Sequence, residues 1–108
     1  QICLLGYSFG ASVILSNLKQ FKDPIASVLI SLPPSSVQNG THRTDPRPRL
    51  FLSGDVDRVA PVVRLRELVS TIPYGAELVV ADGVDHTWRA HEERAATETV
   101  QFFLRVLN

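Results

Sequence analysis

Methionine is absent from this 108-residue sequence, cysteine and tryptophan occur once each, and neither sign of charge is in excess. The 11 basic and 11 acidic side chains cancel, so no basic surface of the kind that binds nucleic acid or anionic membranes is expected. The one cysteine, Cys3, can form no internal disulfide, and its apolar neighbours predict a buried, unreactive thiol in a reducing compartment. Since no apolar run is as long as a membrane span and no signal peptide opens the sequence, we expect a cytoplasmic protein.

The missing methionine also bears on completeness. The sequence starts inside an apolar run that resembles a core strand, whereas a complete translation product starts with methionine. Its length and its 44% hydrophobic content suit one ordinary globular domain at most. We therefore expect residues 1–108 to be a partial domain, the C-terminal part of a longer protein.

Apolar runs and helical periodicities alternate along the chain. Short apolar runs predict strands at 2–5, 25–30, 49–53 and 77–81. Helices are predicted at 11–20, 61–71 and 91–107. The strand runs are apolar throughout instead of alternating with polar residues, which is typical of parallel strands covered on both faces. The pattern predicts an α/β fold, a parallel sheet of about four strands with flanking helices.

Finer features of these elements are also predicted. The first helix would carry Lys19 and Lys22 in its last turn, where cations suit the helix dipole. Residues 33–48 are rich in turn formers and predict an exposed loop with at most one helical turn. The last helix has one apolar side, which we expect to be its buried face: Ala96, Val100, Phe103 and Leu107.

The first strand runs directly into Gly6-Tyr7-Ser8-Phe9-Gly10, and helix-forming residues follow. A serine on a tight strand-to-helix turn is exposed above the sheet, and the backbone N–H groups of the turn can donate to an oxyanion. Gly6 and Gly10 would lie where strand and helix almost touch, so a side chain at either position would force them apart. The alternative is an ordinary glycine-rich turn with a solvated serine.

Acidic and basic side chains follow two later strands. Asp55 and Asp57 come after the third strand, and His86 comes after the fourth. Because the carboxyl ends of parallel strands share one edge, these residues and Ser8 are expected to lie together. Ser8, an aspartate and His86 follow one another along the chain as nucleophile, acid and base do in α/β-hydrolases.

The other polar residues suit structural roles better. Asp55 directly follows a glycine and is typical of a turn residue, as is Asp85. His91 begins a helix and His42 lies in the polar loop, so both are expected to be solvated. Trp88 is expected to pack its turn onto the core. No cluster has metal-ligand spacing, so we expect neither a metal site nor a cofactor.

These motifs together resemble the C-terminal half of an α/β-hydrolase, and are most similar to the small, lidless, dienelactone-hydrolase-like serine hydrolases. Residues 6–10 match the nucleophile elbow, and residues 50–61 resemble the strand that leads to the catalytic acid. Residues 83–88 resemble the turn that carries the catalytic base. The resemblance implies Ser8 as nucleophile, Asp57 as acid and His86 as base. It also implies acyl transfer on a small carboxylic ester or thioester, with the Phe9 N–H as one oxyanion donor.

The sequence departs from the family by lacking its first four strands and the loop that supplies a second oxyanion donor. We therefore expect an active parent protein and weak or no activity in this part alone. The 33–48 segment is too short for a helical lid, which favours an open site and a small substrate. The first strand would become a bare sheet edge with exposed apolar side chains, through which two copies could pair as a homodimer.

Two other classes of function compete with this interpretation. A catalytically silent α/β-hydrolase-like interaction module, or an inactive truncated product, would suit a chain without its N-terminal half. A nucleotide-binding domain would require a richer glycine loop or a following lysine, and is set aside.

Overall fold

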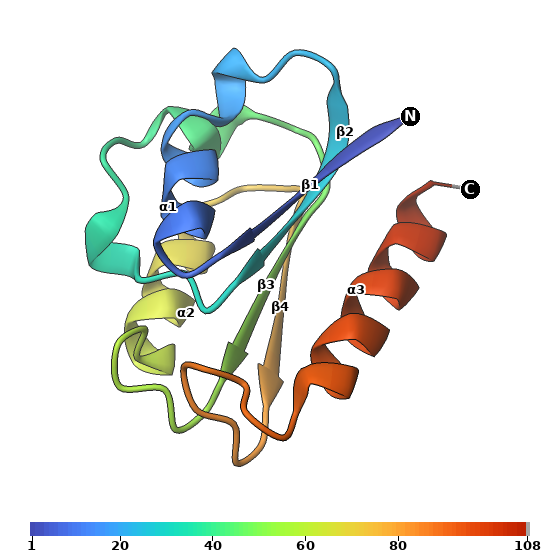
Figure 1. Cartoon of the computed structure of the whole chain (residues 1–108). Helices are drawn as coiled ribbons and strands as arrows, with labels where there is room; N and C mark the ends of the chain where they lie inside the picture. The colour runs from blue at the N-terminus through green and yellow to red at the C-terminus, as the bar shows by residue number, and fades with distance from the viewer. Residues whose placement is uncertain (108) are drawn as a thin grey trace.

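The computed structural model describes residues 1–107 and contains a four-stranded parallel sheet (Figure 1). Its strands lie side by side in chain order: β1 (Ile2–Tyr7), β2 (Pro24–Ile30), β3 (Arg49–Gly54) and β4 (Ala76–Ala81). The α-helices are α1 (Phe9–Ser16), α2 (Val62–Ser70) and α3 (Glu92–Val106). Helices α1 and α2 cover one face of the sheet and α3 covers the other (Figure 1). The predicted parallel α/β architecture is confirmed.

Two apolar cores, one on each face, explain the continuous apolar strands. Successive strand residues point to opposite faces, so Val28 packs toward α3 and Leu29 toward α1. The core beneath α3 includes the fully buried Phe102, and the core beneath α1 and α2 includes Phe51. A polar residue at these positions of β2 or β3 would be buried against one helix layer or the other.

Strand β1 forms one edge of the sheet and pairs only with β2 among the described residues. Its side chains Ile2 and Leu5 are 52% and 57% exposed, so the predicted bare apolar edge is confirmed. Cys3, expected to be buried, is half-buried instead. The reason is its place on this edge strand, which has a neighbour on one side only.

Two helix predictions need correction. Helix α1 ends at Ser16, where Asn17 bonds to the carbonyl of Val13, and a separate 3-10 turn, η1 (Leu18–Gln20), follows. The predicted lysines therefore lie beyond α1. In α3 the predicted face is rotated, because Val100 is 53% exposed while Phe102 is fully buried. Phe102 belongs to a second set of apolar residues with helical spacing, and its ring fills the core beside Trp88.

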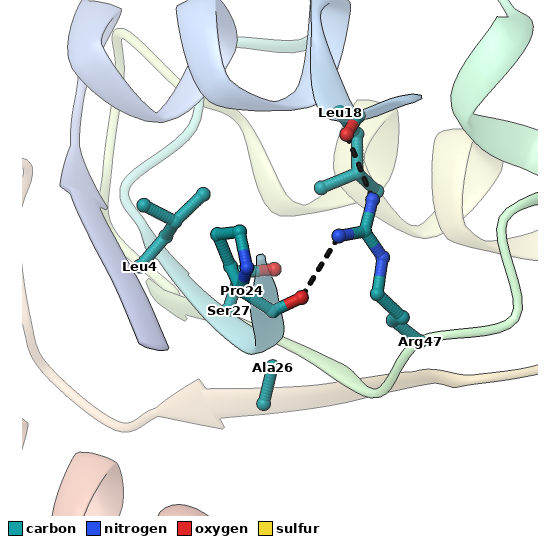
Figure 2. Close-up of a pocket in the computed structure, with 6 residues that line it drawn as sticks. All are labelled: Leu4, Leu18, Pro24, Ala26, Ser27 and Arg47. Atoms are coloured by element: carbon teal, nitrogen blue, oxygen red, sulfur yellow. Dashed lines mark hydrogen bonds between the residues drawn. The ribbon is translucent and has the colours of Figure 1, made fainter. Parts of the chain in front are cut away.

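The segment between β2 and β3 is less exposed than predicted. It contains two short 3-10 turns, η2 (Pro34–Ser36) and η3 (Thr41–Thr44), and buries His42 and Asp45. Arg47 anchors its end, donating hydrogen bonds to the carbonyls of Leu18 and Pro24 at 2.8 Å each (Figure 2). The hollow drawn in Figure 2 lies near the start of β2, at the opposite end of the sheet from Ser8, and has no room for a water molecule.

Candidate active site

Ser8 lies on the turn between β1 and α1 with φ 55° and ψ −122°, in the left-handed region that non-glycine residues avoid. Such a backbone costs on the order of 1–3 kcal/mol and persists only where its surroundings fix it. Here the Ser8 N–H donates to the carbonyl of Ile30 at 2.8 Å, and the Ser8 carbonyl accepts from the Ala11 N–H at 3.0 Å. Ser8 therefore lies on a strand-to-helix turn whose positive φ is held by these two hydrogen bonds.

The two glycines of the elbow differ. A Cβ at Gly6 would come within 2.7 Å of the Ile14 side chain and 2.8 Å of Ala11 Cα, so Gly6 permits the close approach of strand and helix. A Cβ at Gly10 would meet nothing within 4 Å. The prediction is confirmed for Gly6 and wrong for Gly10, because Gly6 faces Ala11 rather than Gly10 across the elbow.

Ser8, His86 and Asp57 form one hydrogen-bonded chain. The distance from Ser8 Oγ to His86 Nε2 is 2.7 Å, and His86 Nδ1 lies 2.8 Å from Asp57 Oδ2. The Asp57 side chain is fully buried, and that of His86 is 18% exposed. The carboxylate accepts at this distance, so the Nδ1 proton lies between His86 and Asp57, and Nε2 presents its lone pair to the Ser8 hydroxyl. This arrangement can take a proton from Ser8.

The loop after β3 separates the roles of its two aspartates. Asp57 Oδ1 accepts from the backbone N–H groups of Val59 and Ala60 at 2.8 and 2.7 Å, which leaves Oδ2 to His86. Asp55 is exposed and accepts from the Gly83 N–H at 2.7 Å, which ties the β3 loop to the β4 loop. Of the two, the structure brings Asp57 to His86.

The turn that carries His86 is stabilised by Asp85 from within. Asp85 Oδ1 accepts from the N–H and hydroxyl of Thr87 and from the Trp88 N–H. The hydrogen bond from the Thr87 hydroxyl is the main cause that lowers the pKa of Asp85 below its ordinary value. Desolvation acts in the opposite sense, and the backbone N–H groups of Thr87 and Trp88 add to the lowering. Asp85 is thus the turn residue expected, and Trp88, 3% exposed, packs onto the core as expected.

Two contacts of this turn were not predicted. Tyr7 Oη donates to the His86 carbonyl at 2.8 Å, and Ser31 Oγ donates to the same carbonyl at 3.2 Å. Burial and, after it, the charges of Asp57 and Asp85 raise the pKa of Tyr7, so its hydroxyl stays a donor. The one sequence signal for Ser31 is its place directly after β2, at the same edge as Ser8.

The remaining histidines lie outside this hydrogen-bonded chain. His91 is half-buried at the start of α3. His42, predicted to be solvated, is fully buried; burial, then the charges of Arg49 and Arg43, lowers its pKa to about 4. Its position in η3 is fixed by the folding of the 33–48 segment against the sheet, which no local pattern indicates.

The amino end of α1 begins at Phe9, next to Ser8. The first N–H groups of a helix have no intrahelical acceptor, so the Phe9 N–H is available as a donor beside Ser8 Oγ. Within residues 1–107 no group of three acidic, histidine or cysteine side chains could bind a metal ion. In the same range no helix is both long and apolar enough to cross a membrane.

Neither a protein-family model nor a curated protein matches the sequence significantly. Solved structures do match. An esterase of Pyrococcus furiosus superimposes with a TM-score of 0.81 at 18% identity, covering 99% of this chain and 54% of its own. A serine hydrolase homologue of Coxiella burnetii gives 0.79 at 22% identity, covering 93% and 48%. A lidless serine hydrolase of Xanthomonas campestris gives 0.78 at 21%, covering 95% and 46%.

The likeness to these proteins shows the fold. The chain has the fold of part of an α/β-hydrolase and spans about half the length of the structures that it matches.

Proposed function

We propose that this chain carries the catalytic residues of a serine hydrolase that acts on a small carboxylic ester or thioester. The main support is the hydrogen-bonded chain of Ser8, His86 and Asp57. Ser8 Oγ lies 2.7 Å from His86 Nε2, and His86 Nδ1 lies 2.8 Å from Asp57 Oδ2. The esterase and serine hydrolase neighbours support the same reaction class.

In the proposed reaction Ser8 Oγ attacks the acyl carbon while His86 Nε2 takes the hydroxyl proton. The developing oxyanion accepts a hydrogen bond from the Phe9 N–H, and Asp57 stabilises the imidazolium. The tetrahedral intermediate collapses, the bond to the alcohol or thiol breaks, and His86 returns its proton to that leaving group. Water then attacks the acyl-enzyme by the same steps, releasing the acid and restoring Ser8. No cofactor enters this scheme, and a cytoplasmic setting remains our expectation.

The test is pre-steady-state hydrolysis of short-chain p-nitrophenyl esters by the purified chain. The proposal predicts a burst of p-nitrophenol, one equivalent at most, followed by the weak turnover expected of this part alone. Ser8→Ala and His86→Ala should each abolish both. A folded chain with no burst and no turnover would contradict it for this chain. The alternative, a catalytically silent interaction module, draws its support from the exposed apolar edge of β1.

A further inference from the structure

We propose that Ser31 is a positioning residue for His86 and acts together with Tyr7. Their hydroxyl groups fix the backbone carbonyl of His86, so that its imidazole stays between Ser8 and Asp57. This inference rests on the proposed function, because it concerns the base of that reaction.

The topology explains why such fixation is needed. His86 follows β4 and Ser8 follows β1, the two edge strands of the sheet. With neighbouring strands about 4.8 Å apart, three spacings separate these ends by roughly 14 Å. The His86 turn must therefore extend across the ends of β3 and β2 to reach Ser8. Asp57 contacts it from β3, and Ser31 contacts it from β2.

The hydrogen-bond roles of Ser31 are set by its partners. Ser31 is fully buried with φ 51°, and its N–H donates to the carbonyl of Leu52 at 2.8 Å, which fixes it to β3. Its Oγ lies 2.8 Å from Trp88 Nε1 and 3.2 Å from the His86 carbonyl. An indole nitrogen only donates, so Ser31 Oγ accepts there and directs its own proton to His86. One hydroxyl therefore binds the turn at two points.

Tyr7 supplies the second donor to the His86 carbonyl, at 2.8 Å, and its ring centroid lies 5.7 Å from that of His86. A carbonyl oxygen has two lone pairs, which these two donors occupy. The turn also contains positive φ angles at Trp88 and Ala90, 59° and 66°, a strained backbone that relaxes unless it is bound. Without both hydroxyl groups the His86 carbonyl loses these two donors, and the turn keeps only its internal Asp85 bonds and the packing of Trp88.

The test compares Ser31→Ala, Tyr7→Phe and the double variant with Ser53→Ala as a matched control. Ser53 is also a fully buried serine, in β3, but its Oγ has no hydrogen-bond partner in the described structure. Ser31→Gly serves as a second variant that tolerates the positive φ. Circular dichroism verifies folding. The readouts are the kcat and KM of ester hydrolysis and the NMR signal of the His86 Nδ1 proton.

We expect Ser31→Ala to lower kcat about tenfold and Tyr7→Phe about threefold at unchanged KM, the scale of one buried hydrogen bond. The double variant should lose more than the product of the single losses, since either donor partly replaces the other. The Nδ1 proton of the variants should exchange faster with water, and Ser53→Ala should match the wild type in both readouts.

An unchanged Nδ1 signal and kcat in the double variant would overturn the inference, as would equal losses in Ser53→Ala. So would a folded wild type without a protected Nδ1 proton. If the wild type shows that proton, and the variants lose its protection, but no ester is hydrolysed, the positioning role stands and the proposed function fails.

Discussion

The Asp57 carboxylate sets the chemistry of His86. One of its oxygens is occupied by two backbone N–H groups, and the other lies 2.8 Å from His86 Nδ1. An ionised carboxylate only accepts, so it selects the tautomer whose Nε2 is free to act as a base toward Ser8. An amide at this position can donate to Nδ1 and so select the opposite tautomer.

Asp57→Asn should therefore lower kcat by about four orders of magnitude while the chain stays folded. Asp55→Asn is the matched control: it makes the same chemical change and keeps the oxygen that accepts from the Gly83 N–H. We expect its kcat to stay within about threefold of wild type, as for an exposed hydrogen bond. Steady-state kinetics on a p-nitrophenyl ester measures both. A larger loss of kcat in Asp55→Asn than in Asp57→Asn would show that Asp57 is not the catalytic acid.

Single residues also show how far the sequence allows prediction. That Ser8, Asp57 and His86 come together at one edge could be predicted, because each follows an apolar run and parallel strands bring such positions to the same edge. Ser31 was not identified. It bonds to a residue 55 positions later, and a serine after a strand is too common to mark such a contact.

Among the elements, the 33–48 segment differs most from its sequence-based prediction. Its composition indicates exposure, yet His42 is fully buried, and Arg47 ties the segment to Leu18 and Pro24. These are contacts between segments distant in sequence, which no local periodicity encodes. In α3, by contrast, two apolar sets share the same helical spacing, and only packing against the sheet selects the one with Phe102.

Burial of His42 makes stability depend on pH. Its pKa falls from 6.5 to about 4 on folding, so protonation favours the unfolded chain. The stabilising effect is complete above pH 6.5 and is lost as pH falls toward 4. Between pH 7.5 and 5 the wild type should lose about 2 kcal/mol more unfolding free energy than His42→Gln, which cannot titrate. Urea unfolding at both pH values measures this; parallel losses in the two proteins would contradict it.

At the scale of the whole molecule, the main feature is the edge of the sheet at β1, which no other described strand covers. The β1 edge leaves Leu5 57% exposed, and Leu5 lines an apolar groove with Ile30, Ala96 and Val100 of the α3 side. An exposed edge with apolar side chains is a template for pairing with another strand. The apolar edge of β1 is therefore a surface on which another strand could pair.

We propose that the purified chain self-associates through β1. Leu5→Lys should shift it toward monomer because a charge at the edge opposes pairing. Val63→Lys is the control, since Val63 is 68% exposed on α2, away from this edge. Sedimentation velocity over a range of concentrations distinguishes them. A wild type that stays monomeric, or equal shifts in both variants, would contradict the proposal.

The activated serine is tested most directly by covalent labelling with a fluorophosphonate probe, read as intact mass. We expect one adduct per chain, located on Ser8 and absent from both Ser8→Ala and His86→Ala. A chain that circular dichroism shows to be folded but that forms no adduct, or an adduct that survives Ser8→Ala, would show that Ser8 is not an activated nucleophile.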